Sequence, residues 1–142
     1  MTQETKLRLE KEKVEVEKLF HEASESQGEA CGINCDWHDN AAFEFATRQT
    51  ELFGSKLMQI NKLLQQSKLT LPRTETDTVG IGNKIVLKIN GEEREFTLLT
   101  EEDSITRKEW LSCDSPIGKK IIGKPVGIYE NVEIIKILKG DF

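Results

Sequence analysis

The sequence predicts an α+β protein: an N-terminal antiparallel coiled-coil hairpin over residues 1–70, a linker at 71–78 and a small α+β domain over 79–142. Apolar residues spaced three and four apart fill the first half, whereas apolar and polar residues alternate after residue 84. Aromatic residues make up 6% of the chain and charged residues 32%, which favours exposed helices beside one small core.

The first predicted helix runs from about residue 6 to residue 23. Its apolar residues recur at spacings of seven, four and three among alternating lysines and glutamates; they are Leu9, Val16, Phe20 and Ala23. This pattern gives a narrow apolar stripe, too thin to cover a globular core. The helix is therefore expected to pack mainly on a second helix.

The second predicted helix has the clearer pattern. Its apolar stripe follows an unbroken three-four alternation through Phe43, Ala46, Thr50, Phe53, Leu57, Ile60 and Leu64. Such an alternation is typical of a coiled-coil seam. Pro72, several threonines and two glycines follow, so the helix is expected to end near Ser67.

The sequence of the second half predicts several β-strands. Ile85, Leu87 and Ile89 alternate with polar residues, and Asn90-Gly91 is the dipeptide that favours a two-residue hairpin turn. The stretches "KEWLSC" and "NVEIIKIL" predict further strands, and "SPIGKKIIG" predicts a short helical turn between them.

Net charge, the distribution of apolar residues and the cysteine content limit the partners and the cellular location that we expect. The net charge is -5, which argues against free duplex DNA as a first partner because phosphate binding needs a positive surface. No stretch approaches the roughly 20 apolar residues that span a bilayer, and the start of the chain has no apolar signal core. We expect a cytoplasmic protein, a monomer without membrane contact, whose three cysteines are free thiols.

Two motifs in the second half resemble a known family. "VGIGNKIVL" at 79–87 and "SPIGKKIIGKPVG" at 115–127 are closely similar to segments of the C-terminal domain of the bacterial GreA/GreB transcript cleavage factors. The resemblance implies an FKBP-like fold for this domain. Family members also place a coiled-coil hairpin ahead of it, so the resemblance covers nearly the whole chain.

The resemblance also assigns the hairpin tip, near residues 31–40. The family's tip pattern of Asp, hydrophobic, Ser, Glu, Asn corresponds here to Asp36, Trp37, His38, Asp39 and Asn40. This implies a transcription elongation factor that is not itself an enzyme. It would enter the secondary channel of bacterial RNA polymerase, where Asp36 and Asp39 donate Mg²⁺ ligands and stimulate cleavage of backtracked RNA. The protein would need no cofactor of its own and, when free, hold no metal stably; it would act with the polymerase's Mg²⁺.

The tip departs from the family pattern in three places. Asp39 stands where the family has Glu, and Trp37 and His38 replace an aliphatic residue and a serine. Since small displacements can be costly in a positioned reaction, a channel-binding inhibitor or modulator without cleavage activity is the alternative. Capping of the second helix by Asp39 or Asn40 is the plain structural reading.

Other contacts follow from the resemblance as well. The family docks on a rim coiled coil of the polymerase through the turn that corresponds here to Asp114, Ser115, Pro116, Ile117 and Lys119. Arg48 and Lys56 are candidates for contact with the nascent RNA 3′ end, although ordinary helix salt bridges would also explain them.

Two hypotheses for the cysteines near the tip stay open. Cys31, Cys35 and His38, with His21, have the ligand types of a zinc site, and Cys31 and Cys35 could form a reversible disulfide. Cys113, in a predicted strand, is expected to be a small core residue. A prolyl isomerase is disfavoured because residues 79–142 hold only four aromatic residues: Phe96, Trp110, Tyr129 and Phe142.

Overall fold

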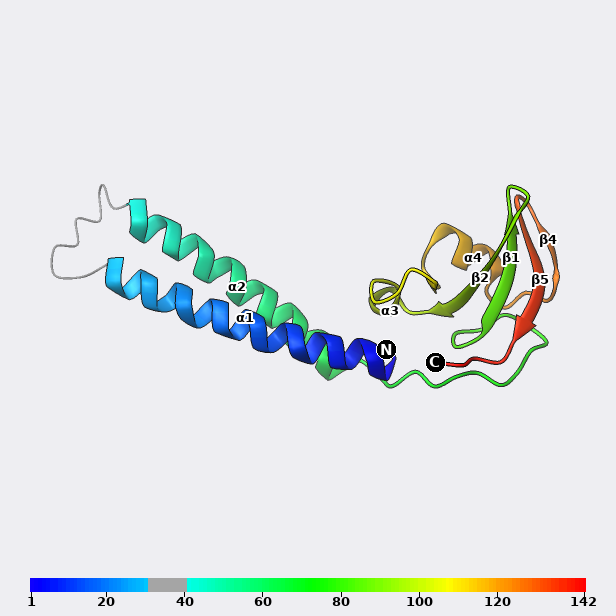
Figure 1. The fold of residues 1–142 in the computed structure, drawn as a ribbon, viewed down its shortest axis with the longest axis horizontal. Helices are drawn as coiled ribbons and strands as arrows, with labels where there is room; N and C mark the ends of the chain where they lie inside the picture. The colour runs from blue at the N-terminus through cyan, green and yellow to red at the C-terminus, as the bar shows by residue number, and fades with distance from the viewer. Residues whose placement is uncertain (31–40) are drawn as a thin grey trace. The chain divides into compact units, whose positions relative to one another are not determined.

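The structure, a computed structural model, describes residues 1–30 and 41–142 (Figure 1). The chain divides into two compact units. One contains Leu7–Ser67, and the other contains Met1–Lys6 together with Lys68–Phe142. The first six residues therefore belong with the sheet, even though a hairpin helix starts among them. The α+β class predicted from the sequence is confirmed.

The first unit is a pair of antiparallel helices, α1 (Gln3–Ala30) and α2 (Ala41–Gln66). The residues of the predicted stripes are buried or half-buried: the most buried are Leu9, Val16, Ala23, Ala46 and Ile60. The seam is thus confirmed, and so is the end of α2 near Ser67. Helix α1 extends seven residues beyond the predicted residue 23, through a stretch with little apolar character.

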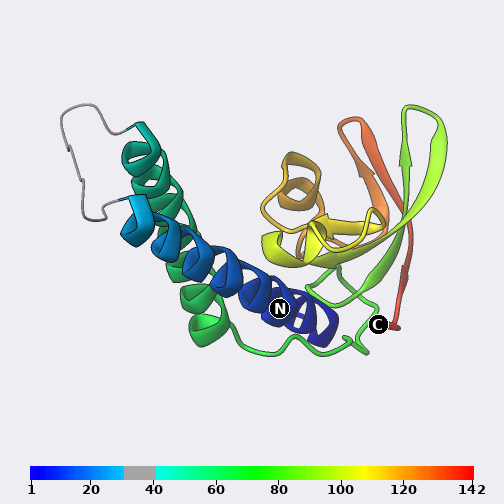
Figure 2. The same cartoon turned by 60° about the vertical axis from the view of Figure 1, so that its left-hand side comes forward.

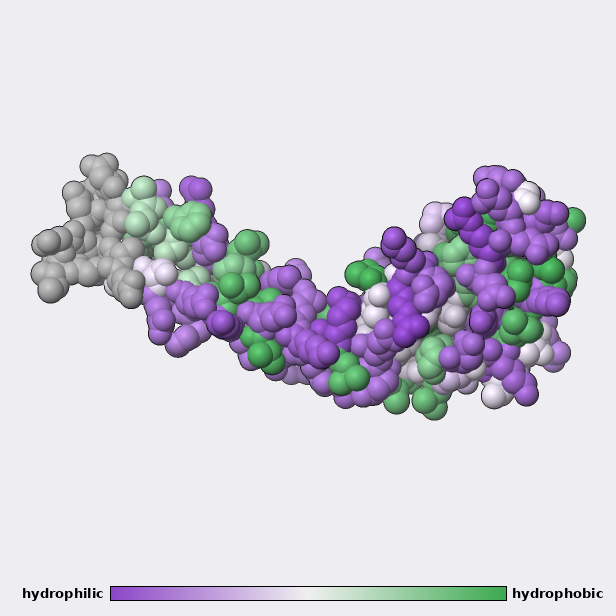
Figure 3. All heavy atoms as spheres, viewed as in Figure 1, coloured by the Kyte–Doolittle hydropathy of each residue, from purple (hydrophilic) through white to green (hydrophobic). Residues whose placement is uncertain are grey.

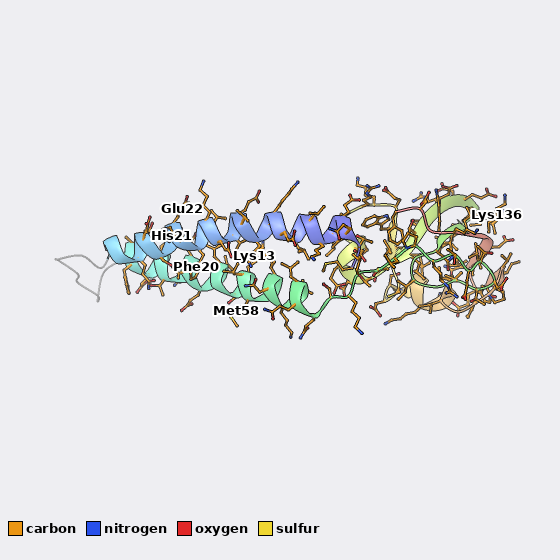
Figure 4. The ribbon with its side chains drawn as sticks, turned by 90° about the horizontal axis from the view of Figure 1, so that it is seen from below. Lys13, Phe20, His21, Glu22, Met58 and Lys136 are labelled. Atoms are coloured by element: carbon orange, nitrogen blue, oxygen red, sulfur yellow. The ribbon has the colours of Figure 1, made fainter. Side chains whose placement is uncertain are left out.

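Specific contacts join the two helices. The ring of Phe20 lies over Gly54, where a Cβ atom would meet the ring at 3.2 Å. Figure 4 shows Phe20 between the helices and Met58 pointing away from α1. Closer to the far end of α1, the amide of Gln27 donates a hydrogen bond of 3.0 Å to the Thr47 hydroxyl. This polar contact holds the helices together where the apolar stripe of α1 has ended.

The second unit is built on a five-stranded sheet. Its strands are β1 (Lys84–Ile89), β2 (Glu92–Leu99), β3 (Trp110–Ser112), β4 (Gly127–Tyr129) and β5 (Val132–Leu138). The spatial order is β3-β2-β1-β5-β4, with β2 and β3 parallel and the other neighbours antiparallel.

The β1–β2 hairpin forms as predicted. Asn90 and Gly91 have φ angles of 52° and 85°, the positive values that a two-residue hairpin turn requires. The predicted strands at "KEWLSC" and "NVEIIKIL" correspond to β3 and β5. Strand β4 and the single-turn helix α3 (Glu101–Ser104) have no counterpart in the prediction: each is too short to show a period, and neither lies within a longer predicted stretch, as the equally short β3 does.

Helices α3 and α4 (Pro116–Ile121) lie against one face of the sheet (Figure 2). The core lies on that face and consists of Val79, Ile85, Leu87, Leu98, Ile121, Val132, Ile134 and Ile137. Cys113 packs against this core, as expected, but it lies in the turn after β3 rather than in the strand. Burial raises the pKa of its thiol, which keeps it protonated.

Within the described residues, no helix has both the length and the apolar character needed to cross a membrane.

Candidate functional site

The predicted hairpin tip lies outside the described residues. This applies to Asp36, Trp37, His38, Asp39 and Asn40, and to Cys31 and Cys35 as well. Two helices flank these residues in the sequence: α1 ends at Ala30 and α2 begins at Ala41. At about 1.5 Å per residue, each of these helices is roughly 40 Å long.

The second predicted site, the turn at residues 114–119, is well defined. Ser115 is the N-cap of α4: its hydroxyl accepts a hydrogen bond from the Gly118 amide at 3.0 Å. The same hydroxyl donates to the Ser112 carbonyl at 2.6 Å, and Pro116 occupies the first turn, where a missing amide hydrogen costs nothing. The Ser-Pro pair therefore fixes the start of α4 against the end of β3.

Gly118 allows this turn to sit close to the sheet. It is buried, and a Cβ atom there would overlap the carbonyl of Ser112 and the backbone of Cys113. Only glycine fits at such an approach. The resemblance to the family at this position thus has a packing reason.

The five predicted contact residues fall into two groups. Asp114, Pro116 and Lys119 are exposed, whereas Ser115 and Ile117 are half-buried, and Ile117 packs against the core. The side chains of the exposed three are accessible to solvent. The other two build the turn that presents them.

The neighbouring lysines already have partners within this unit. Lys120 forms an ion pair of 2.6 Å with Glu130, and this pairing lowers the pKa of the Glu130 carboxyl. The Lys124 ammonium lies 4.5 Å from the ring centroid of Tyr129, a cation–π distance. Both lysines therefore help to hold the loop after α4 and strand β4.

The two RNA-contact candidates differ in their surroundings. Both lie on α2, and Arg48 is exposed. The Lys56 ammonium lies 2.9 Å from a carboxylate oxygen of Glu12 on α1, so part of its charge is already neutralised within the hairpin. Arg48 is consequently the stronger of the two candidates for contact with a phosphate.

His21, the described member of the possible zinc set, is exposed on α1 and lies 3.1 Å from Glu25. Within residues 1–30 and 41–142, no three His, Cys, Asp or Glu side chains gather as a metal site would need. The zinc and disulfide hypotheses depend on Cys31, Cys35 and His38, which this structure does not describe.

Three of the four aromatic residues considered for a proline pocket line a cleft of about 420 Å³ in the sheet unit. Phe96, Trp110 and Phe142 contribute to it, but charged pairs surround it. Lys84 lies 3.4 Å from Glu95 and 3.3 Å from Asp141, and Arg107 pairs with Glu4. Ion-paired side chains therefore line much of this cleft, whereas a proline ring requires an apolar pocket.

A buried carboxylate in the sheet unit has no counterpart among the residues predicted from the sequence. Asp103 in α3 is fully buried; Thr2 donates to it from its amide at 2.7 Å and from its hydroxyl at 3.0 Å, and Thr100 donates at 2.8 Å. Burial alone would raise the pKa of this carboxyl, but the hydrogen bonds from Thr5, Thr2 and Thr100 outweigh it and lower the pKa. No local pattern in "EEDS" distinguishes Asp103 from its acidic neighbours.

The arrangement defines a class of protein: a helical hairpin joined to a small sheet domain with a capped, exposed turn. The family model described as "Transcription elongation factor, GreA/GreB, C-term" matches residues 74–137. Transcription elongation factor GreA of Thermotoga petrophila and that of Thermotoga maritima are each 32% identical over 130 residues, covering 89% of this chain and 83% of the relative. The chain belongs to the GreA/GreB family.

The chain is also similar to other proteins. Transcription elongation factor GreA of Prosthecochloris aestuarii is 36% identical over 104 residues, which is 70% of this chain and 64% of that protein. Among solved structures, the transcription factor Gfh1 aligns with a TM-score of 0.48 at 17% identity, covering 96% of this chain and 95% of that one. The GreA factor homolog 1 of Thermus thermophilus aligns with a TM-score of 0.47 at 16% identity, covering 99% and 96%.

Proposed function

We propose that this protein is a transcription elongation factor that binds bacterial RNA polymerase through its secondary channel and stimulates the polymerase's own cleavage of backtracked RNA. Membership of the GreA/GreB family, together with acids at Asp36 and Asp39, is the observation that carries this proposal. In it the protein is a partner rather than an enzyme, and it works in the cytoplasm.

The chemistry of the donor set suits this role. Mg²⁺ prefers oxygen ligands and takes one or two carboxylates from a protein, and in phosphodiester hydrolysis it activates the attacking water. Asp36 and Asp39 would offer two such carboxylates to the polymerase's ion, and the protein would hold no metal of its own. Each flanking helix, roughly 40 Å long, would supply the reach into a channel.

The turn before α4 would form the second contact. Asp114, Pro116 and Lys119 are exposed there, and the Ser115 cap and the buried Gly118 hold them in place. In the proposal this surface docks on the rim coiled coil of the polymerase. Docking would supply the affinity, and the acids would supply the activity.

Arg48 would contact the nascent RNA near its 3′ end. Its exposure on α2 supports this contact. Lys56 would contribute less, because Glu12 already pairs with it at 2.9 Å.

The tip sequence favours one second candidate. Asp39 is one methylene shorter than the family's Glu, and Trp37 and His38 are larger than the residues they replace. A protein with such a tip could occupy the channel and inhibit the polymerase without stimulating cleavage. Run-off transcription distinguishes the two, because an inhibitor lowers product even where no backtracking occurs.

Transcript cleavage by a stalled, backtracked bacterial polymerase complex with Mg²⁺ tests the main proposal. Wild type is compared with the Asp36→Asn, Asp39→Asn double variant, which should bind the polymerase as tightly but lose cleavage. The matched control is Asp114→Asn, which should weaken binding while leaving the maximal cleavage rate intact. No cleavage by bound wild type would favour the inhibitor.

A further inference from the structure

A narrow apolar stripe joins the two helices of the hairpin. On α1 it ends at Ala23, and on α2 it passes through the small residue Ala46. Figure 3 shows hydrophilic side chains over much of the visible face of the hairpin. Such a stripe defines the register of the two helices weakly, because a slip of one turn exchanges one apolar contact for a similar one. That slip would displace the end of one helix by about 5.4 Å.

A polar residue follows this stripe towards the end of α1. Gln27 lies four residues after Ala23, hence on the same face of α1, and it is half-buried. Its side-chain amide donates a hydrogen bond of 3.0 Å to the Thr47 hydroxyl on α2. That hydroxyl in turn donates to the Phe43 carbonyl at 2.8 Å, which leaves its oxygen free to accept from Gln27. The hydrogen bond between the helices therefore forms only when Gln27 and Thr47 face each other.

The contact between Phe20 and Gly54 lies one heptad away from this hydrogen bond. Phe20 precedes Gln27 by seven residues on α1, and Gly54 follows Thr47 by seven residues on α2. Because the helices are antiparallel, both contacts require the same register. The fit at Gly54 is close, since a Cβ atom there would meet the Phe20 ring at 3.2 Å.

These two contacts oppose a slip in either direction. Sliding α2 by one turn in one direction would bring Leu57 or Met58 to the place of Gly54, where a ring from α1 leaves little room for a side chain. Sliding it by four residues in the other direction would place Phe43 opposite Gln27, whose amide would then lose its acceptor. In coiled coils, a polar pair in the seam fixes the register and adds little stability.

We propose that Gln27 and Thr47 are positioning residues for transcript cleavage, because their hydrogen bond sets the register of α1 against α2. The inference rests on the proposed function, in which Asp36 and Asp39 donate ligands to the polymerase's Mg²⁺. Both acids lie between the two helix ends in the sequence, so the register decides where they are delivered. A displacement of about 1 Å can cost about a hundredfold in a positioned reaction. The pair acts on the rate of cleavage and not on docking, which uses the turn at 114–119.

Replacing the pair by apolar residues separates register from stability. The double variant Gln27→Leu, Thr47→Val fills similar space without the hydrogen bond, so its unfolding midpoint in urea should equal that of wild type or exceed it. Its maximal rate of transcript cleavage, measured at saturating protein, should fall about tenfold or more, because the acids are no longer held in one position. Its affinity for core polymerase should change by less than about twofold.

Thr50 provides the matched control on the same helix. Its hydroxyl also donates to the carbonyl four residues earlier, that of Ala46, at 2.9 Å, but among the residues that the structure describes it makes no hydrogen bond to α1. Thr50→Val should therefore keep the cleavage rate within about twofold of wild type. Thr47→Ser, the conservative change, keeps the acceptor and should retain cleavage, whereas Thr47→Val alone should lose it.

Spin labels at positions 22 and 44, which are exposed on α1 and α2, measure the register directly. The labels are attached to non-natural amino acids, because the chain has three cysteines of its own. Wild type should give one narrow distance distribution, and the double variant a broader or displaced one. Circular dichroism of each variant verifies that the hairpin still forms.

Equal maximal rates for wild type and the double variant, or an unchanged distance distribution, would overturn the proposal. An equal loss of cleavage in Thr50→Val, or a loss that follows a lower unfolding midpoint, would do so as well, since the changes would then act through stability alone. Failure of wild type to stimulate cleavage would instead overturn the proposed function. The distance measurement would still show whether Gln27 and Thr47 set the register, so the two failures are distinguishable.

Discussion

Asp103 accepts a hydrogen bond of 2.7 Å from the backbone amide of Thr2, although 101 residues separate them in the chain. The Thr2 hydroxyl donates to the same carboxylate oxygen and accepts from the Thr5 amide at 3.2 Å, which caps the first turn of α1. The buried carboxylate of Asp103 thus links the start of α1 to the rest of the sheet unit.

Replacing Asp103 should destabilise the fold. Asp103→Ala would leave the buried amide of Thr2 and the half-buried hydroxyl of Thr100 without their acceptor, and the Thr2 hydroxyl with only Thr5 as its acceptor, at a cost of about 3 kcal/mol. Urea unfolding followed by circular dichroism measures this. Asp77→Ala, at an exposed residue, is the control; an equal loss in both variants would contradict the role assigned to Asp103.

The same carboxylate should make stability depend on acid. The pKa of Asp103 is lower in the folded protein than in the unfolded chain. Its contribution to the free energy of unfolding is therefore complete above the pKa that Asp103 has in the unfolded chain, about 4, and is lost as the pH falls from there towards the folded-state pKa. Unfolding free energies measured between pH 6 and pH 3 should therefore fall more steeply for wild type than for Asp103→Asn. Parallel curves would show that Asp103 is not the group responsible.

Gly118 should tolerate no side chain. In Gly118→Ala the new methyl group would overlap the Ser112 carbonyl, so we expect a loss of about 2 kcal/mol and weaker polymerase binding through the displaced turn. Gly28→Ala is a useful counterpart, because nothing lies within 4 Å of a Cβ there. It should stabilise α1 by roughly 0.5–1 kcal/mol. Thermal unfolding of both variants tests the pair.

Asn83 should be hard to replace. Its side chain is fully buried; its oxygen accepts from the Gly80 amide at 2.9 Å, and its amide nitrogen donates to the carbonyls of Glu75 at 2.7 Å and Leu138 at 3.0 Å. Asn83→Ala would leave these three groups unpaired and should cost about 3 kcal/mol. Asn131→Ala, at an exposed site, is the comparison. Equal midpoints in urea would refute this assignment.

Local patterns allowed much of the fold to be predicted. Two examples are the apolar stripe through Ala46 and Ile60 and the turn at Asn90-Gly91. Each depends on residues that are close together in the chain, so a local sequence pattern is enough to predict it. Strand β4 was missed because its three residues show no period and, unlike those of β3, do not lie within a longer predicted stretch. Asp103 was missed because Thr2, which donates two of its hydrogen bonds, lies 101 residues away in the chain. A contact between residues so far apart leaves no local pattern in the sequence.

The residues of the candidate site were predicted mainly from the resemblance to the GreA/GreB family and less from local sequence patterns. The Ser115 cap and the Gly118 approach have local signatures, and the structure gives each a physical reason. The packing of Ile117 against the core and the pairing of Lys56 with Glu12 depend on contacts between elements, which single-sequence patterns do not reveal. Asp36 and Asp39 lie outside the described residues, so their role stays a prediction.

The union of Met1–Lys6 with Lys68–Phe142 makes the sheet unit discontinuous in sequence. A growing polypeptide emerges from the ribosome starting at its amino end, so Thr2 must wait while some hundred residues are synthesised before Asp103 becomes available. Hairpin helices with local contacts can form during that interval, whereas the sheet unit closes last. A fragment comprising residues 68–142 alone would lack the Thr2 donors and should be less stable than the same unit in the full chain.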